Sequence, residues 1–183
     1  SESKFLYLPI ALKGDSKYDS AKEWMDSVLS MHNRTDLKYE TWNNLDDKTF
    51  IDLKSFDAVY IGGGNTWNLY KEIIDSGFDA ILIKYINGGG IAYGGSAGAI
   101  IFGKLINTQN DDKEVDIKNE GLGLLGNLSI ACHYVPESND FYSKFAKDNG
   151  TDILCLYEES GALFSNEGLS DCGSKKSLVI KSI

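Results

Sequence analysis

Residues 88–101 read Gly-Gly-Gly-Ile-Ala-Tyr-Gly-Gly-Ser-Ala-Gly-Ala-Ile-Ile, so that one apolar run passes through small residues into another. This order predicts a strand, a sharp turn and a helix that begins near Ala97. Gly94, Ser96 and Gly98 give the G-x-S-x-G spacing of a nucleophile elbow, in which small neighbours let one hydroxyl project from the end of a strand. The competing interpretation is an ordinary glycine-rich turn with no catalytic role. The other segments of the sequence have to distinguish these two interpretations.

A second segment of the same kind precedes this one. Residues 57–66 read Asp-Ala-Val-Tyr-Ile-Gly-Gly-Gly-Asn-Thr, and residues 67–74 follow with helical spacing. Two such units in succession predict parallel βαβ wiring. Loops after the carboxyl ends of neighbouring parallel strands meet at one crevice. We therefore expect Gly64 to lie close to Ser96 and to help stabilise an oxyanion there. A phosphate site is the weaker interpretation, because residues 62–67 match neither the P-loop nor the dinucleotide pattern.

The other apolar segments continue the alternation of strands and helices. An amphipathic helix is predicted over residues 20–29, with Trp24 on its apolar face, and His32 is expected to be a solvated residue at its end. Pro9 is expected to end the first strand, because proline cannot donate to a sheet ladder. The remaining strands are predicted within residues 5–12, 39–42, 128–132 and 153–157.

Composition narrows the classes of function. The chain has 183 residues and a net charge of −9, which argues against a nucleic-acid or anionic-membrane partner, because phosphates are bound by clustered Lys and Arg. Its three cysteines have neither metal-ligand spacing nor an even number, so we expect no metal site and a reducing, cytoplasmic setting. No apolar run has the length of a membrane span, and no signal peptide is recognisable. We expect one domain over residues 1–183.

A serine nucleophile needs a base, and the chain contains two histidines. His133 is the candidate, because it follows a predicted strand whose end opens on the same crevice as Ser96. Cys132 alternates to the other face of that strand and is expected to be a core thiol. The carboxylate that orients the base is either Glu158, after the next predicted strand, or Asp111, in the polar loop after the turn. Charge pattern alone leaves both open, and we place Glu158 slightly ahead because the end of a strand holds a side chain more rigidly than a polar loop does.

These motifs resemble those of the peptidase E (aspartyl dipeptidase) family, which includes the cyanophycinases. The residues that carry the resemblance are 60–66, 94–99, Asp111 and His133, and the likeness extends from about residue 5 to just beyond residue 158. It implies an α/β fold with an open, mostly parallel sheet and helices on both faces, similar to class I glutamine amidotransferases with serine in place of cysteine. It implies a serine peptidase of small peptides without a cofactor.

The resemblance also implies roles for individual residues. By this match Ser96 is the nucleophile and His133 the base, while Glu158 and Asp111 are both described as the acid. The backbone N–H groups of Gly64 and Ala97 would form the oxyanion hole, and the neighbouring Asn65 and Thr66 would contact substrate.

The chain also departs from the family pattern. The family carries a strand and a helix before the strand at Phe5, so an upstream unit is expected to be missing. The single arginine, Arg34, is far along the chain from the motifs, and neutral donors predominate near them. A carboxylate pocket without guanidinium loses bidentate recognition, so we expect weak or broadened selectivity for N-terminal aspartate.

Two classes of function follow. The first is an intracellular serine peptidase, and the second is an inactive relative that keeps the turn as a scaffold for binding. The presence of Ser96, His133 and both acid candidates favours the enzyme. The oligomeric state is open between monomer and homodimer.

Overall fold

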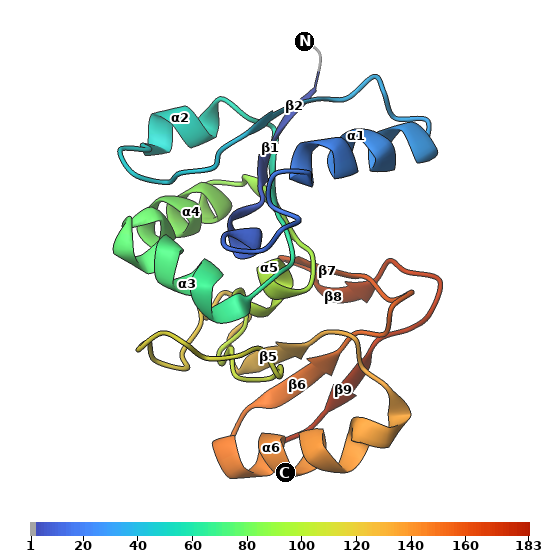
Figure 1. Cartoon of the computed structure of the whole chain (residues 1–183). Coiled ribbons are helices and arrows are strands. Elements are labelled where there is room, and N and C mark those ends of the chain that lie inside the picture. Colours follow the sequence, from blue (N-terminus) through green and yellow to red (C-terminus); the bar gives the residue numbers. More distant parts are fainter. Residues whose placement is uncertain (1–2) are drawn as a thin grey trace. The chain divides into compact units, whose positions relative to one another are not determined.

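The computed structural model describes residues 3–183, which form two compact units (Figure 1). Unit 1 comprises residues 3–98 and 112–117, and unit 2 comprises residues 99–111 and 118–183. The single domain expected over residues 1–183 stays a prediction. Among residues 3–183, no helix combines the length and apolar character that crossing a bilayer requires.

Unit 1 is built on a four-stranded sheet in the order β2-β1-β3-β4, and every pair in it is parallel. The parallel βαβ wiring predicted from the two strand-glycine segments is therefore confirmed. Because the order places β3 beside β4, the glycine loops that follow these strands emerge at the same edge of the sheet. The elements of unit 1 are β1 (Lys4–Leu8), η1 (Ile10–Leu12), α1 (Ala21–Met31), β2 (Lys38–Thr41), α2 (Phe50–Lys54), β3 (Ala58–Ile61), α3 (Thr66–Asp75), α4 (Phe78–Asn87) and β4 (Ile91–Gly94).

Local sequence explains where several of these elements begin and end. β1 ends at Leu8, immediately before Pro9, as predicted. α2 begins with a reciprocal capping box, in which the side chains of Thr49 and Asp52 satisfy each other's backbone N–H groups. His32 is the exposed residue that ends α1, which confirms its predicted place.

Helices cover both faces of the sheet in unit 1. On one face, Ala21 and Met25 of α1 pack on Tyr7 and on the partly buried Phe5 and Tyr39. On the other face lie α2, α3 and α4 (Figure 1), above apolar residues of β1 and β3 that have lost all contact with water. Unit 1 is thus the α/β arrangement expected from the sequence. The fully buried residues of this second face are Leu6, Leu8, Val59 and Ile61.

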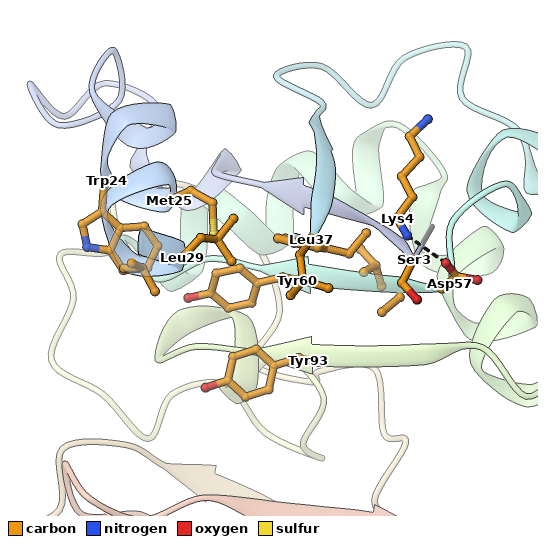
Figure 2. Close-up of a pocket in the computed structure, with 13 residues that line it drawn as sticks. Ser3, Lys4, Trp24, Met25, Leu29, Leu37, Asp57, Tyr60 and Tyr93 are labelled. Carbon is orange, nitrogen blue, oxygen red and sulfur yellow. Dashed lines mark hydrogen bonds between the residues drawn. The ribbon is translucent and has the colours of Figure 1, made fainter. Parts of the chain in front are cut away.

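α1 leaves part of its sheet face uncovered, and a groove with a volume of about 560 Å³ runs along it (Figure 2). Tyr60 of β3 and Tyr93 of the edge strand β4 line the groove with ring centroids 5.0 Å apart. Trp24 lines the same groove, on the predicted apolar face of α1, and its ring centroid lies 6.5 Å from that of Tyr60, although the residue is 49% exposed.

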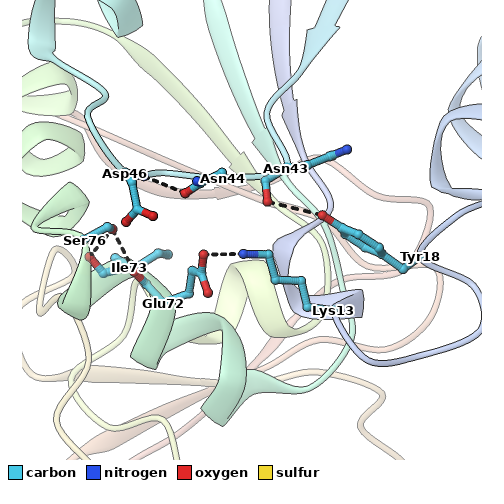
Figure 3. Close-up of polar contacts among 8 residues, drawn as sticks. All are labelled: Lys13, Tyr18, Asn43, Asn44, Asp46, Glu72, Ile73 and Ser76. Carbon is cyan, nitrogen blue, oxygen red and sulfur yellow. Dashed lines mark hydrogen bonds and ion pairs between the residues drawn. The ribbon is translucent and has the colours of Figure 1, made fainter.

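Polar contacts attach the surface segments around α3 (Figure 3). Lys13, just after η1, forms an ion pair with Glu72 of α3. Ser76 ends this helix, and its hydroxyl donates to the carbonyl of Glu72 at 2.7 Å. The side chain of Tyr18 donates to the carbonyl of Asn43 at 3.2 Å. The ion pair of Lys13 with Glu72 attaches α3, whose first turn carries candidate functional residues, to the segment after η1.

Unit 2 contains a three-stranded sheet in the order β5-β6-β9, with β5 and β6 parallel and β9 antiparallel to β6. α6 packs on this sheet through Tyr142 and Ala146, which share a buried cluster with Ala131 and Ile153. The strands β5 and β6 confirm the predictions for those segments. The elements of unit 2 are β5 (Leu128–Ala131), η2 (Pro136–Ser138), α6 (Asn139–Asn149), β6 (Asp152–Cys155), the hairpin of β7 (Ala162–Ser165) and β8 (Gly168–Asp171), and β9 (Leu178–Ile180).

Candidate active site

The turn after β4 holds Ser96 in a backbone conformation that side chains rarely adopt. Its φ of 48° lies in the left-handed region, and Ser96 is one of four non-glycine residues with positive φ among residues 3–183. The turn is tight, because the N–H of Gly98 donates to the carbonyl of Gly95 at 2.9 Å. A Cβ at Gly98 would lie 2.1 Å from the carbonyl oxygen of Ile61, so only glycine fits there. The spacing of small residues around Ser96 thus has a steric cause.

The helix expected after this turn is much shorter than the sequence suggests. α5 (Ala97–Ile100) is a single turn. The prediction rests on the apolar run that follows the turn, and Gly98 and Gly103 lower the helical propensity of this run. Because a macrodipole needs many aligned peptides, a helix of one turn contributes little of it, and the predicted oxyanion stabilisation would depend on individual N–H groups.

The glycine loop after β3 meets the Ser96 turn, as the parallel wiring predicts. A Cβ at Gly63 would lie 3.1 Å from the Cβ of Ser96. The next residue, Gly64, has a φ of 142°, and a Cβ there would lie 2.2 Å from the carbonyl oxygen of Ala11. The backbone of this loop therefore packs closely between η1 and the Ser96 turn. Gly64 and Ala97, the two predicted oxyanion donors, follow Gly63 and Ser96 in the chain and belong to unit 1.

Asn65 and Thr66, the predicted substrate contacts, begin α3. The Oδ1 atom of Asn65 accepts a hydrogen bond from the N–H of Asn68 at 2.9 Å and so caps the helix. Its Nδ2 atom donates to the carbonyl of Asp112 at 3.0 Å. Thr66 is 1% exposed. The Asn65 amide is engaged at both ends, and its observed role is to join the α3 terminus to the segment at Asp112.

In unit 2, His133 and Glu158 are in contact. The Nδ1 atom of His133 lies 2.6 Å from Oε1 of Glu158. The register of the parallel strands pairs Ala131 with Cys155, which places His133 and Glu158 shortly after the paired ends. Both side chains are exposed, and the φ of His133 is 57°. With Nδ1–H donating to the carboxylate, Nε2 keeps the lone pair that a general base needs.

The other acid candidate, Asp111, lies in the polar loop of unit 2. Its backbone N–H donates to the side chain of Gln109, and it is partly buried. Glu159, the neighbour of Glu158, is exposed, and its carbonyl accepts from the N–H of Lys175 at 3.3 Å. Glu158 is thus the acid candidate with an observed contact to His133, whereas the role of Asp111 stays a prediction.

Cys132 precedes His133 and packs partly buried beside Ile130 and Leu154. Burial, followed by the negative charge of Glu158, raises the pKa of the Cys132 thiol to about 12. Such a thiol stays protonated at neutral pH and is a poor nucleophile. Within residues 3–183, no group of three or more His, Cys, Asp or Glu side chains is placed to hold a metal ion.

The sequence did not predict the place of residues 112–117. Residues 112–117 belong to unit 1, although the residues before and after them belong to unit 2. In this segment the ammonium of Lys113 lies 4.3 Å from the centroid of the Trp67 ring in α3. The two residues are far apart in the chain, and no periodicity or spacing links them.

Comparisons with known proteins agree with the fold and the motifs. Residues 1–171 match the family model described as Peptidase family S51. Peptidase E of Streptomyces coelicolor is 30% identical over 119 residues, which are 59% of this chain and 49% of that protein. A probable alpha-aspartyl dipeptidase of Drosophila melanogaster is 25% identical over 173 residues, covering 90% of this chain and 67% of the relative. The chain therefore spans about half the length of the Streptomyces protein.

A solved structure shares the fold. The crystal structure of a peptidase from an acI-B1 Actinobacterium superposes with a TM-score of 0.74 at 17% sequence identity, and covers 98% of this chain and 78% of the other. At this identity the likeness concerns the fold alone.

Proposed function

Since the chain belongs to peptidase family S51, we propose that it is a serine-type peptidase that hydrolyses small peptides through an acyl-enzyme on Ser96. The observation that supports this most directly is the Ser96 turn. Its positive φ and the close approach of Gly63 are what a strand-to-helix nucleophile elbow requires, and an ordinary connection would have no need of that strain.

In the proposed mechanism His133 serves Ser96 as base. Nε2 of His133 takes the hydroxyl proton as Oγ attacks the carbonyl carbon of the peptide bond, and the carbonyl oxygen becomes an oxyanion. The intermediate then expels the amine, which receives the same proton from Nε2. Water repeats the sequence on the acyl-enzyme and releases the acid and free Ser96.

Glu158 would orient the imidazole and stabilise its charged form. Its 2.6 Å contact with Nδ1 supports this assignment over Asp111. The backbone N–H groups of Gly64 and Ala97 would donate to the oxyanion. This role fits the fixed backbone at Gly64, because preorganised donors need no rearrangement when the charge develops.

The substrate class proposed is a short peptide. The relatives are named Peptidase E and probable alpha-aspartyl dipeptidase, which makes a dipeptide with N-terminal aspartate the first substrate to test. All three cysteines are free thiols, which suits the reducing, cytoplasmic setting that we also propose.

Labelling by a fluorophosphonate probe tests the proposal, because the probe reacts with an activated serine. We expect stoichiometric modification of Ser96, located by mass spectrometry of the digested protein, and its loss in Ser96→Ala and His133→Ala. Ser170→Ala is the matched control at an exposed serine of unit 2, and it should keep the label. Folded protein that takes no label at Ser96 would favour the inactive binding module.

A further inference from the structure

Glu158 lies in an exposed turn after β6, and its side chain depends on the backbone of that turn for its position. The N–H of Ser160 donates to the carbonyl of Tyr157 at 3.1 Å, which closes a β-turn with Glu158 inside it. The side chain of Glu158 is 72% exposed and that of His133 is 59% exposed. Because core packing restrains neither side chain, the 2.6 Å contact between them depends on how firmly the turn is held.

The chain returns to this turn after the hairpin of β7 and β8, with residues 172–175, which we call the strap. The N–H of Cys172 donates to the carbonyl of Gly161 at 2.9 Å. The N–H of Lys175 donates to the carbonyl of Glu159 at 3.3 Å. The two ends of the strap are thus bonded to the backbone of the turn and of the residues just after it.

Gly173, inside the strap, touches the turn with its backbone. A Cβ there would lie 2.3 Å from the carbonyl oxygen of Glu159 and 2.4 Å from the backbone nitrogen of Gly161. It would also lie 2.7 Å from the carbonyl carbon of Ser160. All three atoms belong to the backbone and cannot rotate away as the end of a side chain does, so only glycine allows this approach. The strap and the turn therefore cannot move independently at this point.

Lys175 attaches the strap a second time, through the ring of Tyr157, which directly precedes Glu158. Its ammonium lies 3.4 Å from the centroid of that ring. The ring of Tyr157 also meets the ring of Tyr134 edge to face, with centroids 5.0 Å apart and planes at 82°. Tyr134 directly follows His133 in the chain. The strap thus contacts the residue next to the candidate acid, and that residue contacts the residue next to the candidate base.

We propose that the strap holds Glu158 against Nδ1 of His133, with Gly173 and Lys175 as its positioning residues. The inference rests on the proposed peptidase function, in which Glu158 keeps the Nδ1–H tautomer of His133. Orientation is the main task of such an acid, and a displacement of about 1 Å costs up to roughly 100-fold in rate. All of these residues belong to unit 2.

Two variants remove the two attachments separately. Gly173→Ala places a methyl group against the backbone of the turn and so displaces it. Lys175→Met keeps the apolar stem and removes the cation over the Tyr157 ring, while Lys175→Arg keeps the charge. Ser174→Ala and Lys176→Met are matched controls at exposed neighbours in the chain. Urea unfolding of each variant verifies that the fold is kept, and if Gly173→Ala does not fold, Lys175→Met decides the test.

Dipeptide hydrolysis gives the first readout. We expect Gly173→Ala to lower kcat about tenfold or more. Lys175→Met should lower kcat about two- to fivefold, Lys175→Arg should restore it, and both controls should stay within about twofold of wild type. KM should change less than about twofold, because the strap positions an acid and not the substrate. In the Glu158→Gln background each loss should shrink below about twofold, since the strap acts through this carboxylate. A full loss in that background, or an unchanged kcat in the strap variants, overturns the inference.

Nuclear magnetic resonance of isotope-labelled protein separates this inference from the proposed catalysis. The chemical shifts of the ring nitrogens distinguish the two neutral tautomers of histidine, and the exposed His32 of unit 1 is an internal reference. We expect His133 to carry its proton on Nδ1 in the wild type and to shift toward the Nε2–H tautomer in the two strap variants and in Glu158→Gln, with His32 unchanged. This readout needs no turnover, so it supports the strap even if the protein takes no fluorophosphonate label. Identical His133 shifts in wild type and strap variants, or a wild type without the Nδ1–H tautomer, overturn the inference.

Discussion

Replacing Glu158 by Gln tests whether this carboxylate orients His133. The substitution keeps the size of the side chain and replaces a charged acceptor 2.6 Å from Nδ1 with a neutral amide. Hydrogen bonds to charged groups are worth about 1.5–3 kcal/mol. At about 1.4 kcal/mol per tenfold change in rate, the expected loss in kcat is roughly 10- to 150-fold. The lower half of this range is favoured, because the side chain of Glu158 is 72% exposed and water takes part in the site.

The stability of the variant should change little. An exposed ion pair contributes about 0.2–1 kcal/mol to the free energy of unfolding. A large loss of kcat with a small shift of the urea midpoint would therefore mark a functional contact.

Steady-state hydrolysis of a dipeptide, followed by chromatography of the released amino acids, gives kcat and KM for each variant. Glu159→Gln is the adjacent control at an exposed carboxylate and should keep kcat within about twofold of wild type. Asp111→Asn tests the competing acid and should cost less than Glu158→Gln. If Asp111→Asn proves the more damaging, or if Glu158→Gln keeps its kcat, the assignment of Glu158 is refuted.

Three further predictions follow from the structure. Ser96→Ala and Ser96→Gly should both lower kcat/KM by several orders of magnitude. In urea unfolding, Ser96→Gly should be more stable than Ser96→Ala by about 0.5–1 kcal/mol, because the φ of 48° at residue 96 suits glycine. Gly98→Ala should lower the free energy of unfolding by about 3 kcal/mol or more, since its Cβ would lie 2.1 Å from the carbonyl oxygen of Ile61, and an unchanged urea midpoint would contradict this packing. Burial raises the pKa values of Cys132 and Cys155 to about 12. The two protonated thiols therefore make their full contribution to the free energy of unfolding below the unfolded thiol pKa of about 8.5, and this contribution is lost as the pH rises toward the folded pKa. The urea midpoint should therefore fall from pH 8.5 to pH 11, less steeply when both thiols are replaced by Ala, and an identical slope in the variant would count against this linkage.

The sequence alone determined the local features of unit 1. The apolar runs that end in glycine predict β3 and β4, because only small residues allow the turns that follow them. Two such units in succession predict parallel strands, and the register of β3 with β4 confirms it. The meeting of the Gly63 loop with Ser96 follows from that wiring, since both loops leave the same edge of the sheet.

The pairing of His133 with an acid needed the tertiary structure. Charge pattern offered Glu158 and Asp111 equally, and only the greater rigidity expected at a strand end favoured Glu158 slightly. The register of β5 with β6 brings Glu158 to His133, and register depends on which side chains of the two strands pack in the core.

Other outcomes also depended on packing between distant segments. α5 ends after one turn although its sequence continues apolar, and Trp24, on the predicted apolar face of α1, stays half exposed in a groove. The contact of Lys113 with Trp67 joins residues far apart in the chain. The sequence thus determines the turns, which follow from steric limits on neighbouring residues, and the parallel direction of β3 and β4, whereas side-chain pairing follows from long-range packing that no local pattern records.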